Sequence, residues 1–457
     1  MINSEETKIK RDILILLAVT AFVFIFRLGS GSLSSWDEAF YAEVSREITG
    51  SGNWIDLTWT GVPWSDKPPL YMWMTACFYK IFGINEFSAR FFSAIAGIFT
   101  VIFTYLLGTK IFSRKTGFLA AVMLASTYHF LWFARSGTLD VTFTLFTLSS
   151  VYFFLLSEEK RTHIIYSFIC FSLAFLTKGV GALLIPVILG SYVIIWRKWY
   201  LIFNRYAFFG VFTSLVILSS WYIPAYLNYG SFFIKNHFLK NLVTRTTGAM
   251  DGHYGNWITY INVILYKAKP WGMVGLISLP FLLIETIKKR NTHNSLLIIW
   301  AIVTFCIFSA AKTKLHWYIM PIYPAIMIIG AWGIEKILRK FSLVVVITCS
   351  LVSLLYFGVK KDIFYMDFNP DIKAFAATVK ETSDNENIYL YRISDPGMSF
   401  YLGRIGRHIS GKQAEEVVLT DTGDAILVTD PHGLGELGIK DKVILSGPGG
   451  VTATKVR

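Results

Sequence analysis

Apolar runs long enough to cross a lipid bilayer recur through most of this chain and constrain its fold more than any other feature. About 20 apolar residues cross roughly 30 Å of hydrocarbon as a helix, and such runs recur from Ile13 to Phe357 and then stop. Of the 457 residues, 54% are hydrophobic and 16% are charged, which is typical of polytopic membrane proteins. We therefore expect a mostly α-helical membrane protein with about eleven transmembrane helices. The predicted spans are, approximately, 12–28, 88–109, 117–135, 138–156, 162–177, 180–196, 206–226, 270–287, 295–311, 317–335 and 342–358.

Basic residues occupy alternate loops and predict the orientation of these spans. They gather in six segments, which are 8–11, 110–115, 160–161, 197–205, 288–290 and 336–340. Because cytoplasmic loops carry the excess of positive charge, we expect these segments and the N-terminus to face the cytoplasm. The outer loops 29–87 and 227–269 and the tail after residue 358 then lie on the extracytoplasmic side. This topology explains most of the net charge of +13, so a nucleic-acid partner is not expected.

The composition changes after residue 358 toward short strands and polar turns. Strands are expected at 387–392, 425–429 and 442–445, with helices at 371–379 and 413–418. The chain therefore divides into a transmembrane domain, 1–358, and a small extracytoplasmic α/β domain, 359–457, which is large enough for a cap or a recognition module.

The four cysteines indicate neither a disulfide framework nor a metal site. Cys170, Cys306 and Cys349 lie in predicted spans, and only Cys77 is near the outer surface. The charged N-terminus lacks a small-residue cleavage site after a short apolar core, so the first span is expected to remain as an anchor.

The first outer loop carries a pair of acids at the start of an amphipathic stretch. Ser35 and Glu38 have the spacing of a capping box, and Asp37 lies in the first helical turn, where an acid suits the helix dipole. A purely structural role is therefore one interpretation. The helix that follows would place one face on the bilayer, because its apolar residues recur at every fourth position. That face consists of Trp36, Phe40, Val44 and Ile48. Asp37 and Tyr41 would then stand beside the lipid headgroups.

The second feature of this loop is a lysine held by two prolines. Pro68 and Pro69 push the preceding Asp66 and Lys67 toward extended geometry. Lys67 would then be presented in a fixed position. In the structural alternative, Lys67 is a snorkelling lysine at the start of a short interfacial helix, 70–83.

Asp140 opens the fourth predicted span shortly after Arg135. A carboxylate at the centre of a span costs about 3 kcal/mol, and less at its edge. Asp140 is either a solvated loop acid or a partner of Arg135, and it is a second candidate for chemistry.

The second outer loop places His237, Asn241 and Arg245 at a spacing of four, on one helical face that suits an anion. His237 and His253 are candidate ligands for a divalent metal, with Asp66 as a further ligand. Two histidines at this separation are a weak metal signal, so a surface role is the alternative. No other cofactor is expected.

Lys312 and Lys314 lie in an outer loop, where lysine is disfavoured by the orientation rule. Phosphate is the ligand that best explains them, and Tyr318 adds a phenolic donor. The alternative is that the rule is only statistical.

Together these motifs resemble those of bacterial lipid-linked-sugar glycosyltransferases of the type C fold. More narrowly, they are similar to the dolichyl-phosphate-mannose protein mannosyltransferase family and its relative, the lipid A aminoarabinose transferase. The resemblance covers about 12–336 and rests on Trp36-Asp37-Glu38-x-x-Tyr41, Lys67-Pro68-Pro69-Leu70, Arg135 to Asp140, His237 to Trp257 and Lys314 to Pro324.

The resemblance implies a membrane enzyme whose donor is a sugar on polyprenyl phosphate and whose acceptor is a lipid such as lipid A, a glycan or a protein. Transfer would invert the anomeric carbon at the outer face of the cytoplasmic membrane, without a nucleotide sugar. The resemblance implies Asp37, with Glu38 beside it, as the acid that activates or positions the acceptor. Among the candidate catalytic acids, Glu38 and Asp140 are second choices, for placing the acceptor or a metal. The residues implied or predicted for the donor phosphate are Lys67, Arg245, Tyr318, Lys312 and Lys314. Those expected to position donor or acceptor are Tyr41, Arg135, His237, Asn241 and His253.

Two other functions compete with this hypothesis. A ligase or polymerase of lipid-linked glycans would share the outer-face chemistry but should lack the early Asp-Glu followed by Lys-Pro-Pro. A lipid or solute transporter would need ionisable groups at mid-membrane, whereas those of this chain collect at one face.

Overall fold

Helices make up most of this protein. In the computed structural model the structure is described for residues 2–244, 248, 255–360, 362–382, 387–393, 395–403, 407–419, 425–439 and 443–456. The chain forms two compact units. The helical unit comprises Met1–Leu28, Ser65–Tyr71 and Phe91–Phe364. The mixed unit comprises Gly29–Trp64, Met72–Arg90 and Tyr365–Arg457.

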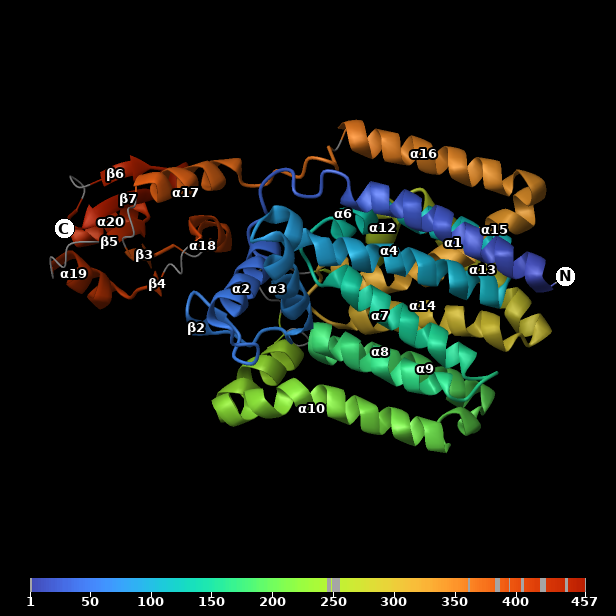
Figure 1. Cartoon of the computed structure of the whole chain (residues 1–457). Helices are drawn as coiled ribbons and strands as arrows, with labels where there is room; N and C mark the ends of the chain where they lie inside the picture. The colour runs from blue at the N-terminus through green and yellow to red at the C-terminus, as the bar shows by residue number, and fades with distance from the viewer. Residues whose placement is uncertain are drawn as a thin grey trace. The chain divides into compact units, whose positions relative to one another are not determined.

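Each predicted span coincides with a helix or a bent pair of helices, because the apolar runs are long and free of internal charge pairs. These helices are α1 (Ile2–Ile25), α4 (Glu86–Ile111), α5 (Arg114–Ala125) with α6 (Tyr128–Ala134), α7 (Asp140–Leu156), α8 (His163–Lys178), α9 (Leu184–Trp196), α10 (Arg205–Phe233), α13 (Trp271–Lys289), α14 (Thr292–Ala310), α15 (Tyr323–Leu338) and α16 (Ser342–Lys360). Figure 1 shows the long helices of the helical unit running roughly along one direction. Within it α7 packs on α8, α8 on α10, and α13 on α15.

By length and composition, six helices within the described residues are able to cross a membrane, or seven if α5 and α6, bent by 69°, count as one span. Two of the six segments, His163–Trp196 and His316–Lys360, each contain two predicted spans. The mostly helical membrane fold is therefore confirmed, and the count of about eleven crossings stays a prediction.

Shorter elements connect the long helices. They are α2 (Asp37–Ser51), β1 (Thr58–Trp59), β2 (Val62–Pro63), α3 (Leu70–Phe82), η1 (Gly179–Leu183), η2 (Trp199–Leu201), η3 (Ile234–Thr244), α12 (Thr259–Lys267), η5 (His316–Ile322) and η6 (Arg339–Phe341). The helix α3 matches the short helix expected at 70–83, and its interfacial location stays a prediction. The π-helix η3 includes Asn241, whereas Arg245 and His253 lie outside the described residues.

The C-terminal part of the mixed unit is a small α/β fold. Its elements are α17 (Pro370–Thr382), β3 (Asn387–Tyr391), α18 (Pro396–Leu402), β4 (Arg407–His408), α19 (Gly411–Leu419), β5 (Ala425–Thr429), α20 (Pro431–Leu437), β6 (Val443–Ser446), η8 (Pro448–Gly450) and β7 (Thr452–Val456). The sheet order is β4-β3-β5-β7-β6, with β3 parallel to β4 and β5 and with β7 antiparallel to both neighbours. The predicted strands and helices of the tail are confirmed, while β4, β7, α18 and α20 are additional.

The first outer loop divides differently from the predicted domains. Most of the loop 29–87 clusters with the tail in the mixed unit, and only Ser65–Tyr71 clusters with the long helices. The loop and the tail, separated by nearly the whole sequence, therefore form part of one compact unit.

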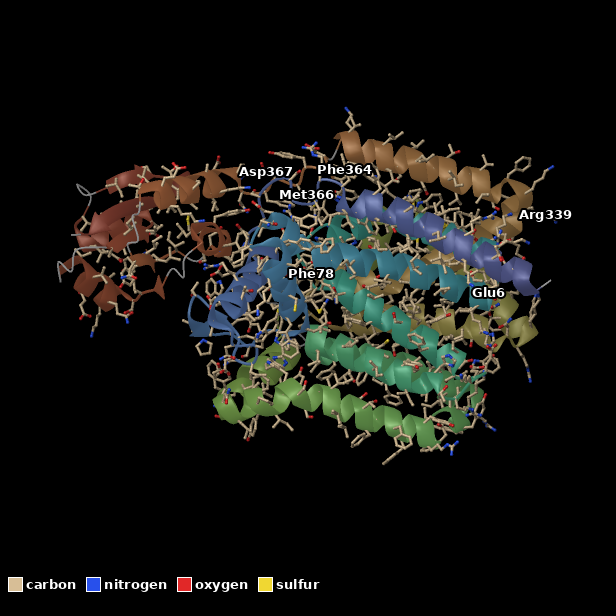
Figure 2. All side chains as sticks on the ribbon, viewed as in Figure 1. Glu6, Phe78, Arg339, Phe364, Met366 and Asp367 are labelled. Atoms are coloured by element: carbon tan, nitrogen blue, oxygen red, sulfur yellow. The ribbon has the colours of Figure 1, made fainter. Side chains whose placement is uncertain are left out.

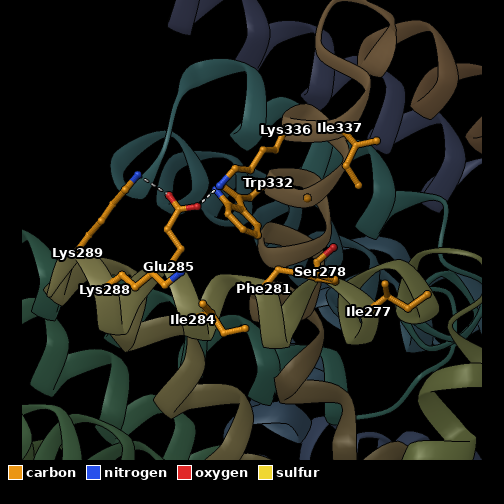
Figure 3. A pocket seen from close by; sticks show the side chains of 11 residues that line it. Ile277, Ser278, Phe281, Ile284, Glu285, Lys288, Lys289, Trp332, Lys336 and Ile337 are labelled. Atoms are coloured by element: carbon orange, nitrogen blue, oxygen red, sulfur yellow. Dashed lines mark hydrogen bonds and ion pairs between the residues drawn. The ribbon is translucent and has the colours of Figure 1, made fainter.

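A cavity of about 530 Å³ lies between the C-terminal halves of α13 and α15 (Figure 3). Its lining is apolar toward Ile277 and Phe281, and Lys289 and Lys336 both donate to Glu285 at its basic end. None of the predicted site residues lines this cavity. It is therefore separate from the candidate functional site.

Candidate functional site

The backbone in front of Asp37 is strained. Trp36, the residue before α2, has φ 74° and ψ −127°. Residues other than glycine rarely adopt this backbone conformation, which costs about 1–3 kcal/mol. Asp37 itself begins the helix and is exposed. Strain of this kind persists only where neighbouring contacts enforce it. The loop therefore presents an exposed carboxylate from a backbone held in one conformation.

The predicted capping box does not form at this helix start. Trp36 occupies the N-cap position and makes no side-chain cap hydrogen bond. Glu38 Oε2 instead accepts a hydrogen bond from the backbone N–H of Ser34 at 2.7 Å, while the Ser35 hydroxyl donates to Asp395 at 2.8 Å. The side chains of Ser35 and Glu38 therefore help to hold the shape of this loop.

Glu38 forms a buried ion pair with Arg90. Arg90 Nε lies 2.8 Å from Glu38 Oε1, and both side chains are almost completely buried. The guanidinium also donates to the backbone carbonyls of Ser32 at 2.8 Å and Ser30 at 3.3 Å. A buried pair of this kind is costly to break. The geometry therefore assigns Glu38 a structural role beside the exposed Asp37.

The structure corrects the expectation that one side of α2 faces the bilayer. Val44 and Ile48 are completely buried within the protein, and Phe40 packs on Trp59 with ring centroids 4.5 Å apart. Tyr41, which was expected beside the headgroups, is also buried. The amphipathic pattern is satisfied by packing against protein, which a period of about four residues cannot distinguish from packing against lipid.

One more carboxylate of α2 fastens the hairpin β1–β2. Glu47 accepts hydrogen bonds from the hydroxyl of Thr58 and from the backbone N–H of Gly61. Burial raises the pKa of Glu47, although these hydrogen bonds oppose the rise. The hairpin is therefore held to the helix that carries Asp37.

In the helical unit, His237 fixes the segment that carries Lys67. His237 Nδ1 donates to the backbone carbonyl of Ser65 at 2.7 Å, and Nε2 lies 3.1 Å from the hydroxyl of Tyr222. Because Nδ1 faces a carbonyl, it carries the proton and Nε2 accepts from the tyrosine. Both ring nitrogens thus have partners, and His237 positions the Lys-Pro-Pro segment.

A glycine bend brings the end of α8 to the same place. Gly179 has φ 60°, which ends α8 at Lys178, and a Cβ added to it would lie 3.6 Å from both His237 Nε2 and Pro68 Cγ. Segments around residues 68, 179 and 237 therefore meet, although they are far apart in the sequence.

Lys178, at this bend, is the partner of Asp140. Its Nζ lies 2.5 Å from Asp140 Oδ1, with 11% and 3% of the two side chains exposed. Asp140 starts α7 and Lys178 ends α8, so each charge also complements the dipole of its own helix. The ion pair of Asp140 is thus made with Lys178, whereas Arg135 was the partner considered from the sequence.

The same lysine connects this pair to the last motif. Lys178 Nζ lies 4.9 Å from the ring centroid of Tyr318, in η5, and 5.2 Å from that of Phe143. The structure therefore brings together Asp140 and Tyr318, two predicted site residues, around a cation that sequence reasoning missed. The sequence did contain a signal for Lys178, because a lysine at the outer end of a predicted span also departs from the orientation rule.

The two lysines near Tyr318 differ in their surroundings. Lys312 is exposed, whereas Lys314 is buried and its ammonium group donates to the carbonyls of Phe308 at 3.1 Å and Ser309 at 2.7 Å, at the end of α14. Burial lowers the pKa of Lys314. Lys314 therefore caps a helix C-terminus, which favours a structural role over phosphate binding.

Near the same turn, the buried His129 pairs with the half-buried His316. His129 Nε2 lies 2.8 Å from His316 Nδ1, and the other ring nitrogen of His129 lies 2.5 Å from the hydroxyl of Tyr323. Because His316 is two residues before Tyr318 in the sequence, this network ties α6 and α15 to the turn that presents the phenol.

Arg135 serves as a C-terminal cap for α1. Its guanidinium donates to the backbone carbonyls of Val23, Phe24 and Phe26 at 2.9–3.0 Å and to that of Ile363 at 3.0 Å. The side chain is completely buried. This role differs from the substrate positioning that the sequence predicted.

Replacing Arg135 by methionine is expected to lower the free energy of unfolding by about 3 kcal/mol or more, because several buried carbonyls lose a charged donor. Arg135→Lys should not restore it, since one ammonium cannot reach all four carbonyls. Thermal unfolding in detergent, monitored by size-exclusion chromatography of the heated protein, measures the change. Wild-type thermal stability with lost turnover in Arg135→Met would instead support the predicted positioning role.

A metal site receives no support from the described residues, among which no three His, Cys, Asp or Glu side chains could hold a metal ion together. Of the predicted ligands, Asp66 is partly buried, His237 uses both ring nitrogens, and His253 lies outside the described residues. No step is therefore assigned to a metal.

Comparison with known proteins identifies the relationship. Residues 66–223 match the family model described as dolichyl-phosphate-mannose-protein mannosyltransferase. An undecaprenyl phosphate-alpha-4-amino-4-deoxy-L-arabinose arabinosyl transferase of Proteus mirabilis is 31% identical over 360 residues, which cover 75% of this chain and 62% of that protein. An uncharacterized protein of Aquifex aeolicus is 29% identical over 368 residues, covering 78% of this chain and 72% of that protein.

Solved structures show the same fold. ArnT from Cupriavidus metallidurans, crystallised with undecaprenyl phosphate, has a TM-score of 0.81 at 19% identity and covers 97% of both chains. The archaeal oligosaccharyltransferase AglB from Archaeoglobus fulgidus has a TM-score of 0.62 at 14% identity, over 93% of this chain and 70% of that one.

These findings show that the chain has the type C fold found in integral-membrane glycosyltransferases. Its sequence is similar to protein mannosyltransferases and aminoarabinose transferases, the resemblance that its motifs predicted. The long apolar helices and these relatives indicate a multi-pass protein of the inner membrane. The chain spans about 62% of the length of the Proteus transferase.

Proposed function

We propose that this protein transfers one sugar from a polyprenyl-phosphate donor to an acceptor at the outer face of the inner membrane, with inversion of the anomeric carbon. The observation that carries the proposal is the meeting of Lys178 with Asp140 and Tyr318, beside the bend that packs on the Lys-Pro-Pro segment. The cations of Lys67 and Lys178 and the phenol of Tyr318 come from separate segments of the chain. Two cations and a phenolic donor suit a phosphate at a membrane surface.

In the proposed reaction an acceptor hydroxyl attacks the anomeric carbon. The bond between that carbon and the phosphate oxygen breaks, and its electron pair stays on the polyprenyl phosphate. The proton of the hydroxyl passes to the carboxylate of Asp37, which is exposed and therefore accessible to an acceptor. If the acceptor is itself a phosphate, no base is required.

The departing phosphate gains negative charge as this bond breaks. Lys67, Lys178 and Tyr318 are proposed to stabilise it by charge-assisted hydrogen bonds, which are stronger in a partly dry site. Asp140 holds Lys178 in place, and His237 holds the backbone before Lys67. Arg245 and Lys312 remain proposed additional contacts, from the motif resemblance and from charge respectively.

The orientation follows from charge. With the basic loops in the cytoplasm, the N-terminus is cytoplasmic, and both the motifs and the tail are extracytoplasmic. A donor whose lipid tail stays in the bilayer would then present its phosphate at the outer surface.

The test incubates purified protein with polyprenyl-phosphate sugars and follows donor consumption by mass spectrometry. Undecaprenyl-phosphate aminoarabinose is the first donor because of the relatives' names, and lipid A, a glycan and a peptide are the first acceptors. Donor should be consumed with at least one acceptor. If none is consumed under conditions where a control transferase works, the proposed function is wrong.

Lys67→Ala is expected to lower turnover by about 10²-fold, because one preorganised donor to the departing phosphate is lost. The matched control is Lys80→Ala, which removes an exposed lysine of α3 that lies over the ring of Trp54. Equal turnover in both variants would remove Lys67 from the proposed site.

A further inference from the structure

The loop that carries Asp37 is fastened to the C-terminal tail by hydrogen bonds along its length. Asp367 Oδ1 accepts from both the backbone N–H and the hydroxyl of Ser32, at 2.8 Å and 2.5 Å. The Ser32 hydroxyl in turn accepts from the backbone N–H groups of Phe368 and Asn369 at 3.0 Å and 2.6 Å. These tail residues lie in the segment between α16 and α17, and Asp367 is labelled in Figure 2.

Two further contacts lie closer to Asp37. The backbone N–H of Leu33, which is completely buried, donates to the hydroxyl of Tyr401 at 2.6 Å. The Ser35 hydroxyl donates to Asp395, whose carboxylate also caps α18 through the N–H of Gly397 at 2.7 Å. The loop is thus held at residues 32, 33 and 35 by two tail segments, residues 367–369 and α18 with its N-cap.

The backbones of the loop and the tail are in close contact. Gly31 has φ 81°, and a Cβ added there would lie 2.5 Å from the carbonyl oxygen of Met366. Arg90 joins the same contact, because its guanidinium donates to the carbonyls of Ser32 and Met366 and pairs with Glu38. The loop and the tail therefore form one packed structure within the mixed unit.

The strained Trp36 lies immediately after these contacts and immediately before Asp37. A positive φ at a residue that is not glycine returns to ordinary geometry unless its neighbours prevent it. The side chain of Trp36 is exposed, with 68% of its surface accessible, so its own packing does little to hold the backbone. The contacts at residues 32, 33 and 35 are the ones placed to do so.

We propose that the C-terminal domain is a positioning element for Asp37, and that Tyr401, Asp367 and Asp395 are positioning residues that hold the loop 30–38. This inference rests on the proposed role of Asp37. A separate recognition module, which the sequence suggested for the tail, would not need to share its hydrogen bonds with a loop from the start of the chain. The domain instead completes the loop, because the short loop segment cannot satisfy its own buried backbone groups.

Tyr401→Phe is the sharpest test, because it removes one hydroxyl and leaves the N–H of Leu33 without that acceptor. Tyr391→Phe is the matched control. Tyr391 has the same exposure, 8%, and its hydroxyl donates to Glu436 within the tail at 2.6 Å. We expect Tyr401→Phe to lower kcat about tenfold or more with an unchanged KM for the donor, since small misplacements of a catalytic group are costly. Tyr391→Phe should keep the wild-type kcat.

Ser35→Ala is a second variant, made from the loop side so that the tail keeps its cap at Asp395. Its control is Ser51→Ala, which removes a hydroxyl that donates to the carbonyl of Glu47 at the other end of α2. Ser35→Ala should lower kcat and Ser51→Ala should not. Wild-type kcat in both Tyr401→Phe and Ser35→Ala, or an equal loss in the controls, would overturn the inference.

Hydrogen–deuterium exchange separates this inference from the proposed function. In the full-length protein, amides of the segment 30–38 should exchange faster in Tyr401→Phe than in Tyr391→Phe, whatever substrate the enzyme uses. Unchanged exchange in that segment would overturn the positioning role even if the enzyme is active. An inactive wild type with faster exchange in Tyr401→Phe would instead contradict only the proposed reaction.

Discussion

Asp37→Asn is expected to lower turnover by about 10²–10⁴-fold with a hydroxyl acceptor, because an amide cannot take the proton of the attacking group. The KM for the donor should change little, since the proposed donor contacts are made by other residues. The substitution is nearly isosteric and Asp37 is exposed, so the free energy of unfolding should stay close to that of the wild type. Initial rates measured by mass spectrometry of the product provide the comparison.

Asp56→Asn is the control for this prediction. Asp56 lies in the same loop and accepts a hydrogen bond from the side chain of Asn53 at 3.0 Å, so its substitution changes charge nearby without touching the proposed base. It should retain wild-type turnover. If Asp37→Asn also retains it with a hydroxyl acceptor, Asp37 is not the base, although the enzyme class would stand.

Lys178→Met is expected to lower both turnover and stability. Loss of one cation that is proposed to contact the departing phosphate should reduce kcat by about 10²–10³-fold. The same change leaves Asp140 buried without its partner, which should lower the free energy of unfolding by about 3–5 kcal/mol. Single-turnover rates and thermal unfolding of the same preparations measure the two effects.

The double variant Asp140→Asn/Lys178→Met separates these effects. It removes both charges, so most of the lost stability should return while turnover stays low. Lys198→Met is the matched control, because Lys198 Nζ lies 2.7 Å from Glu158 Oε2 in a similarly buried pair, with 13% and 14% of the side chains exposed. It should lose stability and keep turnover per folded molecule. Recovery of turnover in the double variant would show that Lys178 acts only by pairing with Asp140.

Much of the fold could be predicted because regular patterns of apolar residues recur along the chain. Each apolar run formed a helix, and the strands at 387–391 and 425–429 were found from their alternation. The strand β7 was missed, since a short polar strand at the chain end becomes a strand through pairing with β5 and β6. The bilayer-facing surface assigned to α2 was wrong for Val44 and Ile48, because periodicity shows that one face is buried without showing against what.

The candidate site was predicted in part. Asp37, Lys67 and Tyr318 were visible as polar residues in motifs, whereas Lys178 ends an apolar run and Arg90 begins one. The roles of Lys178 and Arg90 depend on partners far away in the sequence, Asp140 and Glu38 respectively, which no local pattern indicates. The same holds for Arg135, whose acceptors are backbone carbonyls at the end of α1.

The sequence by itself determined a helical membrane protein with a small α/β tail, and its motifs indicated the class of enzyme, because hydrophobicity, charge bias and motif spacing are properties of neighbouring residues. Only the tertiary structure decided which ionisable groups are committed to structure and which remain exposed. It placed Glu38, Arg135 and Lys314 in buried networks and left Asp37 at the surface. The physical reason is that burial makes an unpaired charge costly, and the partners that remove this cost are brought together only by folding.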